Sequence, residues 1–212
     1  MKLTLHVFPP SPRAFKVLVV AHHLGLDYQL SLCDLTKGDQ KSAAYTAINP
    51  NQRMPSLEED DFKLWESNAI IQYLATKKPE SGLLPAEERG RADVARWQFW
   101  ESTSWDPACA ILVFERVIKA FFGRGAPDPT EVEKGLQRFQ HAAKVLDGHL
   151  RGRTYICGNR LTLADFAIGA DLTMAEPAQL PLEGYGEIRR WAAILADLPA
   201  WQRTRAMQTA RR

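Results

Sequence analysis

Residues 3–17 have the sequence LTLHVFPPSPRAFKV, which combines the signals of a short strand, a proline turn and a helix start. Apolar residues recur at every second position of its first five residues, which predicts a strand that ends at Pro9-Pro10. Ser11 followed by Pro12 is typical of a helix N-cap with proline in the first turn. The apolar face of this helix continues to Leu24, and Gly25 ends it.

Further along the chain, strands and helices alternate. The patterns predict a strand at 28–32, a short helix at 39–47, strands at 55–58 and 62–65 joined by a turn at Asp60-Asp61, and a helix at 66–75. The predicted order is therefore β-α-β-α-β-β-α within residues 1–78.

The rest of the chain has helical spacing throughout. Helices are predicted at about 89–122, from Asp128 to Leu150, and at 162–174, 186–195 and 199–210. The predicted fold class is α/β plus all-α, with a helical bundle following the strand-containing half.

Five places carry a resemblance to a known family. They are Ser11-Pro12 with Lys16-Val17, Lys41 before Asn49-Pro50, Met54-Pro55, Glu66-Ser67 with Ala69-Ile70, and Gly158 to Asp165. In this order they resemble the cytosolic glutathione S-transferase family, specifically its serine-type branch, similar to the phi and theta classes and to bacterial members. The resemblance implies a thioredoxin-like glutathione-binding domain at 1–78, a linker at 79–87 and an all-helical domain at 88–212.

The last of these places has a structural explanation. Thr162 followed by Asp165 is a helix N-cap with an acidic partner three residues later. Their role is therefore structural, and the resemblance implies that they start a buried helix, so we keep Thr162 and Asp165 out of the catalytic set.

The resemblance implies that Ser11 is the catalytic residue and that glutathione is the co-substrate. A thiol with a pKa of about 8.5 is only a few per cent thiolate at neutral pH. A serine hydroxyl at a helix N-terminus can stabilise the thiolate without itself being the nucleophile. Hydrolase chemistry is disfavoured, because Pro9-Pro10-Ser11-Pro12 lacks the Gly-x-Ser-x-Gly nucleophile elbow.

The resemblance also implies contacts to the cysteinyl and γ-glutamyl parts of glutathione. The backbone of Met54, before a cis Pro55, pairs with the cysteinyl part. Glu66 matches the γ-glutamyl ammonium, and Ser67 with the helix amides matches its carboxylate.

At the glycyl end, the resemblance implies that Lys41 reaches the carboxylate, with Gln40 and Arg53 nearby. Gln40 stands where the phi-like pattern often has histidine, and Arg53 stands where glutamine is frequent. The chain therefore departs from the family pattern at these two positions.

The resemblance implies that the electrophile pocket lies between the first loop and the first long helices of the second domain. We predict Pro10, Trp105 and Phe114 as pocket walls, because Pro107 should bend the helix and open space toward Ser11. Apolar walls suit an aromatic or alkyl electrophile.

Composition excludes several other classes. The 212 residues are 45% hydrophobic and carry a formal net charge of +2, so the chain has no strong electrostatic footprint for nucleic acid. It contains no membrane-spanning stretch and no signal-peptide layout, so we expect a cytoplasmic protein. Three separated cysteines and five histidines without ligand spacing indicate neither a disulfide framework nor a metal site.

Alternatives to conjugation remain open from sequence. A glutathione-dependent isomerase, dehalogenase or peroxidase would share the same thiolate site, and a non-catalytic binding or regulatory member would keep the fold alone. A cysteine-type reductase is disfavoured, because serine stands at position 11. The family usually forms homodimers, which we expect here.

Overall fold

The computed structural model describes residues 3–209 and divides the chain into two compact units. The first unit extends to Leu84 and also includes the chain from Leu198 onward, and the second unit is Pro85–Asp197. No helix in the described part is long and apolar enough to cross a membrane.

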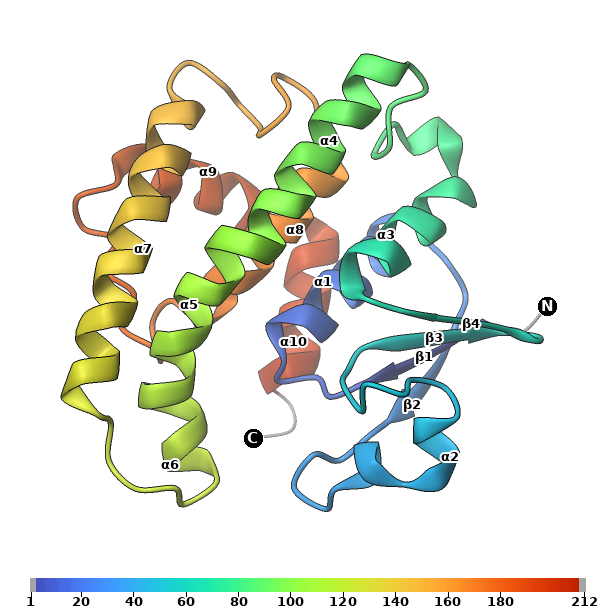
Figure 1. The fold of residues 1–212 in the computed structure, drawn as a ribbon. Helices are drawn as coiled ribbons and strands as arrows, with labels where there is room; N and C mark the ends of the chain where they lie inside the picture. The colour runs from blue at the N-terminus through green and yellow to red at the C-terminus, as the bar shows by residue number, and fades with distance from the viewer. Residues whose placement is uncertain (1–2, 210–212) are drawn as a thin grey trace. The chain divides into compact units, whose positions relative to one another are not determined.

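The first unit is built on a sheet with strand order β2-β1-β3-β4, in which β1 and β2 are parallel and the other pairs antiparallel. Figure 1 shows α1 and α3 on one side of this sheet and α2 on the other. The elements are β1 (Leu3–Val7), α1 (Pro12–His23), β2 (Gln29–Leu32), η1 (Asp39–Lys41), α2 (Ala43–Thr46), β3 (Ser56–Glu59), β4 (Phe62–Trp65), α3 (Ser67–Thr76) and η2 (Pro79–Ser81). The predicted order β-α-β-α-β-β-α is confirmed.

The helix predicted over 39–47 is interrupted. Ser42 has an extended backbone, with φ −62° and ψ 151°, and separates η1 from α2. Its hydroxyl accepts a hydrogen bond from Tyr45 N, so Ser42 is the N-cap of a new helix. By contrast, Gly25 ends α1 as predicted, with a left-handed φ of +61° that suits glycine.

The second unit is all-helical, as predicted. Its elements are α4 (Glu88–Trp100), η3 (Glu101–Trp105), α5 (Asp106–Val113), η4 (Phe114–Ile118), α6 (Lys119–Phe121), α7 (Pro129–Leu150), α8 (Leu163–Gly169), η5 (Ala170–Met174) and α9 (Gly186–Ala196). The segments η3 and η4 are π-helical turns, and η3 ends at Trp105, just before Asp106 and Pro107; Pro107 has no N–H to continue the regular ladder.

The C-terminal helix differs from the predicted domain boundary, which assigned residues 88–212 to the helical domain. Helix α10 (Pro199–Thr209) belongs to the first unit, because it packs along α1. The rings of Phe15 and Trp201 lie edge to face with centroids 4.7 Å apart. Ala210, the predicted end of this helix, lies outside the described residues.

A histidine links α1 to α10. Thr204 Oγ1 donates to Ala200 O at 2.6 Å, so it accepts from His22 Nδ1 at 2.7 Å. Nε2 of His22 then accepts from the Tyr28 hydroxyl at 2.8 Å. Burial first, and then the charge of Arg203, lowers the pKa of His22 to about 4.

This arrangement predicts a pH-dependent stability. The unfolded chain protonates His22 below its ordinary pKa of about 6.5, whereas the folded chain resists protonation until about pH 4. His22 therefore makes its full contribution to the free energy of unfolding above pH 6.5. This contribution, about 1–3 kcal/mol, is lost as the pH falls toward 4. Urea unfolding across this range should show the decline in the native chain and a smaller one in His22→Gln. Replacing the exposed His141 should leave it unchanged, and equal slopes in all three proteins would contradict the assignment.

Candidate functional site

Strand register brings the predicted site residues to one end of the sheet. Val7 of β1 pairs in parallel with Leu32 of β2, and the neighbouring His6 pairs with Ser56 of β3, which in turn pairs with Trp65 of β4. The segments that follow β1, β2 and β4 and the segment that precedes β3 therefore leave from the same end (Figure 1). They carry Ser11, Gln40, Lys41, Arg53, Met54, Pro55, Glu66 and Ser67.

Ser11 is the N-cap of α1, but its hydroxyl does not cap the helix. Its backbone is extended, with φ −73° and ψ 132°, and its side chain makes no capping hydrogen bond. The main chain is held on both sides, because Ser11 N donates to Phe8 O and Phe15 N donates to Ser11 O, both at 2.9 Å. The hydroxyl is thus placed at a helix N-terminus without being used by the helix.

The loop before β3 is fixed from inside the first unit. The Met54-Pro55 peptide bond is cis, which confirms the expectation from the resemblance. The carbonyl of Arg53 accepts two hydrogen bonds of 2.7 Å, from the Tyr45 hydroxyl and from Asn49 Nδ2. Because the Tyr45 proton goes to Arg53, Ser56 Oγ donates to the Tyr45 oxygen at 2.8 Å. Burial raises the pKa of Tyr45 to about 12 and keeps this donor protonated.

The start of α3 combines a strained residue with a buried hydroxyl. Glu66 is the N-cap, is exposed, and has φ +71°, a value that non-glycine residues rarely adopt outside functional or turn positions. Ser67 follows as a buried residue, 7% exposed. Lys16 Nζ donates to Ser67 Oγ and to Asn68 Oδ1, each at 3.2 Å, so a buried ammonium lies directly behind this helix start.

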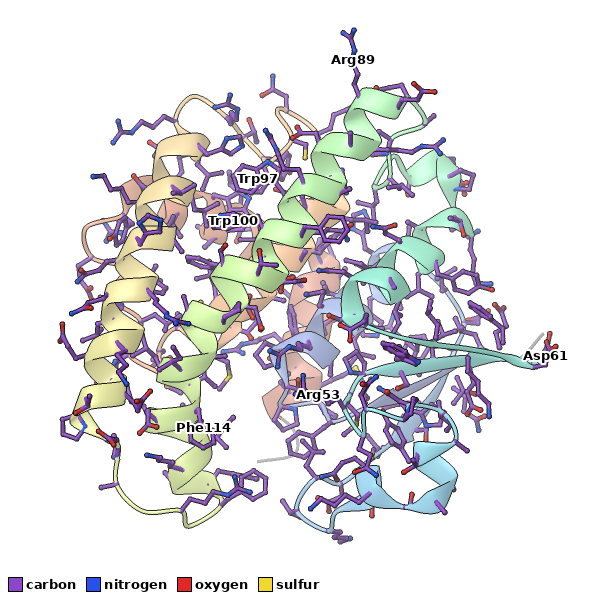
Figure 2. All side chains as sticks on the ribbon, in the orientation of Figure 1. Arg53, Asp61, Arg89, Trp97, Trp100 and Phe114 are labelled. Carbon is purple, nitrogen blue, oxygen red and sulfur yellow. The ribbon has the colours of Figure 1, made fainter. Side chains whose placement is uncertain are left out.

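The side chains of the three residues predicted for the glycyl end are less buried than that of Ser67. Lys41 and Arg53 are exposed, and Arg53 extends from the loop before β3 (Figure 2). Gln40 is half-buried, and its Oε1 has no hydrogen-bond partner among the described residues.

The predicted pocket walls have different environments. Pro10 is half-buried and directly precedes Ser11, and Phe114 is 37% exposed on the helical unit, where Figure 2 labels it. Trp105 has no exposed surface, its Nε1 donates to Ile168 O at 3.1 Å, and its ring lies 5.3 Å from that of Phe139. The prediction for Trp105 is corrected, because its aromatic side chain belongs to the core of the helical unit and lines no accessible pocket.

A groove of about 370 Å³ lies beside Pro107, within the second unit. Five of the seven residues that line it are of polar types, and the seven come from η3, α5 and α7: Thr103, Ser104, Pro107, Gln137, Arg138, His141 and Ala142. None of the three predicted walls contributes to it.

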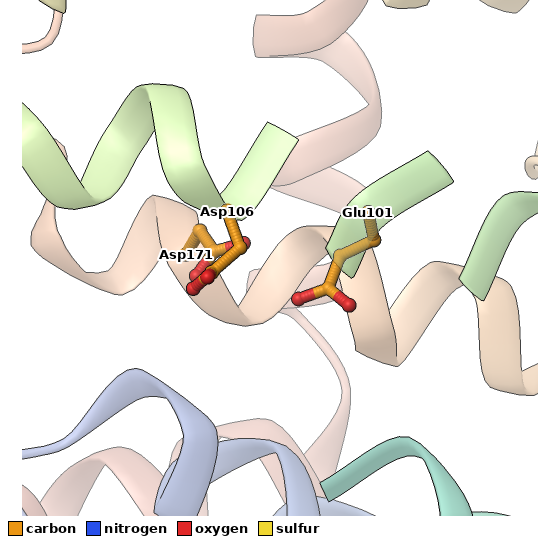
Figure 3. A group of neighbouring side chains, drawn as sticks. All are labelled: Glu101, Asp106 and Asp171. Atoms are coloured by element: carbon orange, nitrogen blue, oxygen red, sulfur yellow. The ribbon is translucent and has the colours of Figure 1, made fainter. Parts of the chain in front are cut away.

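Three carboxylates gather on the helical unit. One oxygen each of Glu101, Asp106 and Asp171 lies within 4.8 Å of the others. Figure 3 shows these three side chains. Ser102 Oγ donates to Glu101 Oε2 at 3.2 Å, and none of the three residues is without a partner. The cluster does not by itself identify a metal site.

All three cysteines are poor nucleophiles in this fold. Burial raises the pKa of Cys33 to about 11 and that of Cys157 to about 12. Cys109 is buried beside the acidic cluster, and both burial and those carboxylates raise its pKa well above the ordinary value. None of these thiols supplies a thiolate near neutral pH.

Two residues that organise this end of the sheet were missed from sequence. Lys16 is the one charged residue in the buried and otherwise apolar run from Ala14 to Ala21. A single lysine in such a run indicates a buried polar contact. Tyr45 gave no comparable signal, because an aromatic residue on a short helix is ordinary core composition.

A thioredoxin-like unit and an all-helical unit in one chain define the two-domain glutathione transferase fold. The family model described as glutathione S-transferase, N-terminal domain, matches residues 1–76, and that described as glutathione S-transferase, C-terminal domain, matches residues 105–199. The chain belongs to the glutathione S-transferase family, and its function is that of a glutathione transferase.

The matches to individual relatives and solved structures cover almost the whole chain. Glutathione S-transferase 3 of Zea mays is 34% identical over 210 residues, covering 95% of this chain and 92% of the relative. The structure of glutathione S-transferase III in apo form is 30% identical, with a TM-score of 0.88, and the match covers 99% of this chain and 98% of that one. A family member from Pseudomonas fluorescens, described with two glutathione bound, is 25% identical, with a TM-score of 0.84 and coverage of 96% and 92%.

Proposed function

We propose that Ser11 activates bound glutathione by donating a hydrogen bond to its sulfur, so that the thiolate attacks a hydrophobic electrophile. The observation that carries this proposal is the Ser11 hydroxyl, which occupies a helix N-cap position yet makes no capping bond. Lowering the thiol pKa by about two units requires roughly 2.7 kcal/mol of selective thiolate stabilisation. A charge-assisted hydrogen bond together with the helix N-terminus accounts for that amount.

The other contacts in the proposal follow the chemistry of the tripeptide. The backbone of Met54 before cis Pro55 pairs with the cysteinyl part, and the double anchoring of the Arg53 carbonyl supports this role by holding the loop. Glu66 matches the γ-glutamyl ammonium, and Ser67 matches its carboxylate.

At the glycyl end, Lys41 and Arg53 supply positive charge for the second carboxylate. Gln40 contributes its side-chain NH₂ group, which donates to the same carboxylate. Because Lys41 and Arg53 are exposed, this end contributes less to affinity than the contact of the γ-glutamyl carboxylate with the buried Ser67.

For the electrophile, we keep Pro10 and Phe114 as apolar contacts and omit Trp105. We assign the chain to the serine-type, phi- or theta-like branch in its bacterial style, acting in the cytoplasm as a homodimer. The 34% identity to the Zea mays enzyme supports the family assignment behind this finer class. Light scattering that gives the mass of one chain would contradict the dimer.

The test is an ultraviolet titration of the thiolate on glutathione-saturated protein. We expect the pKa of the bound thiol to lie about two units below the ordinary thiol value of about 8.5. Binding without a lowered pKa would contradict activation by Ser11. A substrate panel would then separate conjugation from isomerase, dehalogenase or peroxidase chemistry on the same thiolate.

A further inference from the structure

Lys16 is a buried cation beside the proposed γ-glutamyl site. It lies on α1, five residues after Ser11, and is only 2% exposed. Its ammonium donates at 3.2 Å to Ser67 Oγ and at 3.2 Å to Asn68 Oδ1, the first two residues of α3. A lysine in this position either holds two helices together or orients the hydroxyl group that it contacts.

The direction of these hydrogen bonds is fixed by chemistry. An ammonium group has three donors and no acceptor, so Ser67 Oγ must accept from Lys16. The single hydroxyl proton of Ser67 is then directed elsewhere and is available to an acceptor. For the same reason Asn68 presents its oxygen to Lys16 and turns its NH₂ group away. Further interactions of Lys16 do not change the direction of these two bonds.

We infer that Lys16 is a positioning residue that makes the start of α3 selective for the α-carboxylate of the γ-glutamyl group. It orients Ser67 as a hydrogen-bond donor and places a positive charge behind it. This inference rests on the proposed function, because it takes the γ-glutamyl carboxylate as the acceptor at Ser67.

The distances suit this electrostatic role. A carboxylate oxygen that accepts from Ser67 Oγ at about 2.7 Å lies at most about 6 Å from the Lys16 nitrogen. Charges at that separation lie within the Debye length of about 8 Å, and a buried pair is screened less than an exposed one. Lys16 therefore stabilises the bound carboxylate without touching it.

The experiment combines two proteins with two ligands. Glutathione and its analogue lacking the α-carboxylate of the γ-glutamyl residue are titrated calorimetrically into the native protein and into Lys16→Met. We expect Lys16→Met to weaken glutathione by about 10- to 100-fold, since hydrogen bonds to charged groups contribute about 1.5–3 kcal/mol. The analogue should lose less than about threefold, and Lys16→Arg should restore most of the preference for glutathione.

Each of the other possible titration results has its own interpretation. An equal loss for both ligands would assign Lys16 a merely structural role and overturn the inference, as would an unchanged affinity for glutathione. If Lys16→Met does not fold, Lys16→Gln, which keeps a donor but no charge, gives the same comparison. The thiolate pKa of bound glutathione should stay lowered in every Lys16 variant. A native protein that binds no glutathione, or does not lower its pKa, would instead contradict the proposed function.

Discussion

Ser11→Ala is expected to reduce glutathione transfer at pH 7 by about 10- to 100-fold while leaving the affinity for glutathione within about threefold. The bound thiol then titrates near its free pKa of about 8.5, and only a few per cent is thiolate at neutral pH. The rate should recover as the pH is raised, because the pH then supplies the thiolate that the hydroxyl no longer stabilises.

The same substitution should leave stability unchanged. Replacing an N-cap serine by alanine normally costs about 1 kcal/mol, because a backbone amide loses its acceptor. Ser11 makes no such bond, so the free energy of unfolding should change by less than about 0.5 kcal/mol.

Asp128 is the matched control. It is the N-cap of α7 and accepts from Thr130 N at 2.8 Å, so Asp128→Ala should lose about 1 kcal/mol of stability and keep full activity. Rates with a chromogenic aromatic electrophile across pH, together with urea unfolding, measure both properties. Ser11→Thr keeps a hydroxyl and should retain part of the rate. A normal rate for Ser11→Ala at pH 7, or equal losses of rate and stability, would contradict the assignment.

The parts of the fold that could be predicted have signals close together in the sequence. The strand β1 and the helix α1 follow from alternation, Pro9-Pro10, the serine cap and Gly25, all within 25 residues. The β3–β4 hairpin follows from a two-residue turn, in which Asp60 has φ +54°.

Contacts between distant segments could not be predicted in this way. The pattern of residues 199–209 indicates a helix but contains nothing that selects α1 as its neighbour. Trp105 shows the same limit, because helical spacing identifies an inward-facing aromatic residue but not whether core or ligand lies inside. Its contacts with Ile168 and Phe139 show that Trp105 belongs to the core, and both residues are more than 30 positions away in the sequence.

The candidate site contains residues that were identified from the sequence and one contact between distant segments that was not. Its residue types were identified through family motifs, and the sheet register explains why segments 11, 40–41, 53–55 and 66–67 share one end. Lys16 could not be assigned from sequence, because its contact with Ser67 requires α1 to lie against α3. The contact of Lys16 with Ser67 is therefore set by the packing of the two helices and not by a local sequence signal.

Asp165→Ala should cause the largest loss of stability, about 3–5 kcal/mol, a large part of the 5–15 kcal/mol that a folded domain usually has. Asp165 has no exposed surface, and burial raises its pKa to about 6, so it is mainly ionised at neutral pH. It accepts from Ile156 N at 2.8 Å, Thr162 N at 2.9 Å, Trp191 Nε1 at 3.0 Å and Thr162 Oγ1 at 3.1 Å.

These donors come from three separate segments, so Asp165 does more than cap α8, the local role expected from Thr162. Removing the carboxylate leaves buried N–H groups without an acceptor, each at a cost of about 1–3 kcal/mol that is only partly additive. Asp165→Asn keeps the shape but turns an NH₂ group toward donors, and it should lose about 2–4 kcal/mol.

The control is Asp147, a half-buried aspartate that also accepts from backbone amides at a helix start, those of Glu187 at 2.9 Å and Ile188 at 3.2 Å. Because Asp147 is half-buried and its carboxylate is within reach of water, Asp147→Asn should lose only about 1 kcal/mol. Urea unfolding of the four proteins at pH 7 gives the comparison. Losses for Asp165→Ala no larger than for Asp147→Asn would mean that water replaces the buried carboxylate. The capping interaction at Thr162 would then account for the whole contribution of Asp165.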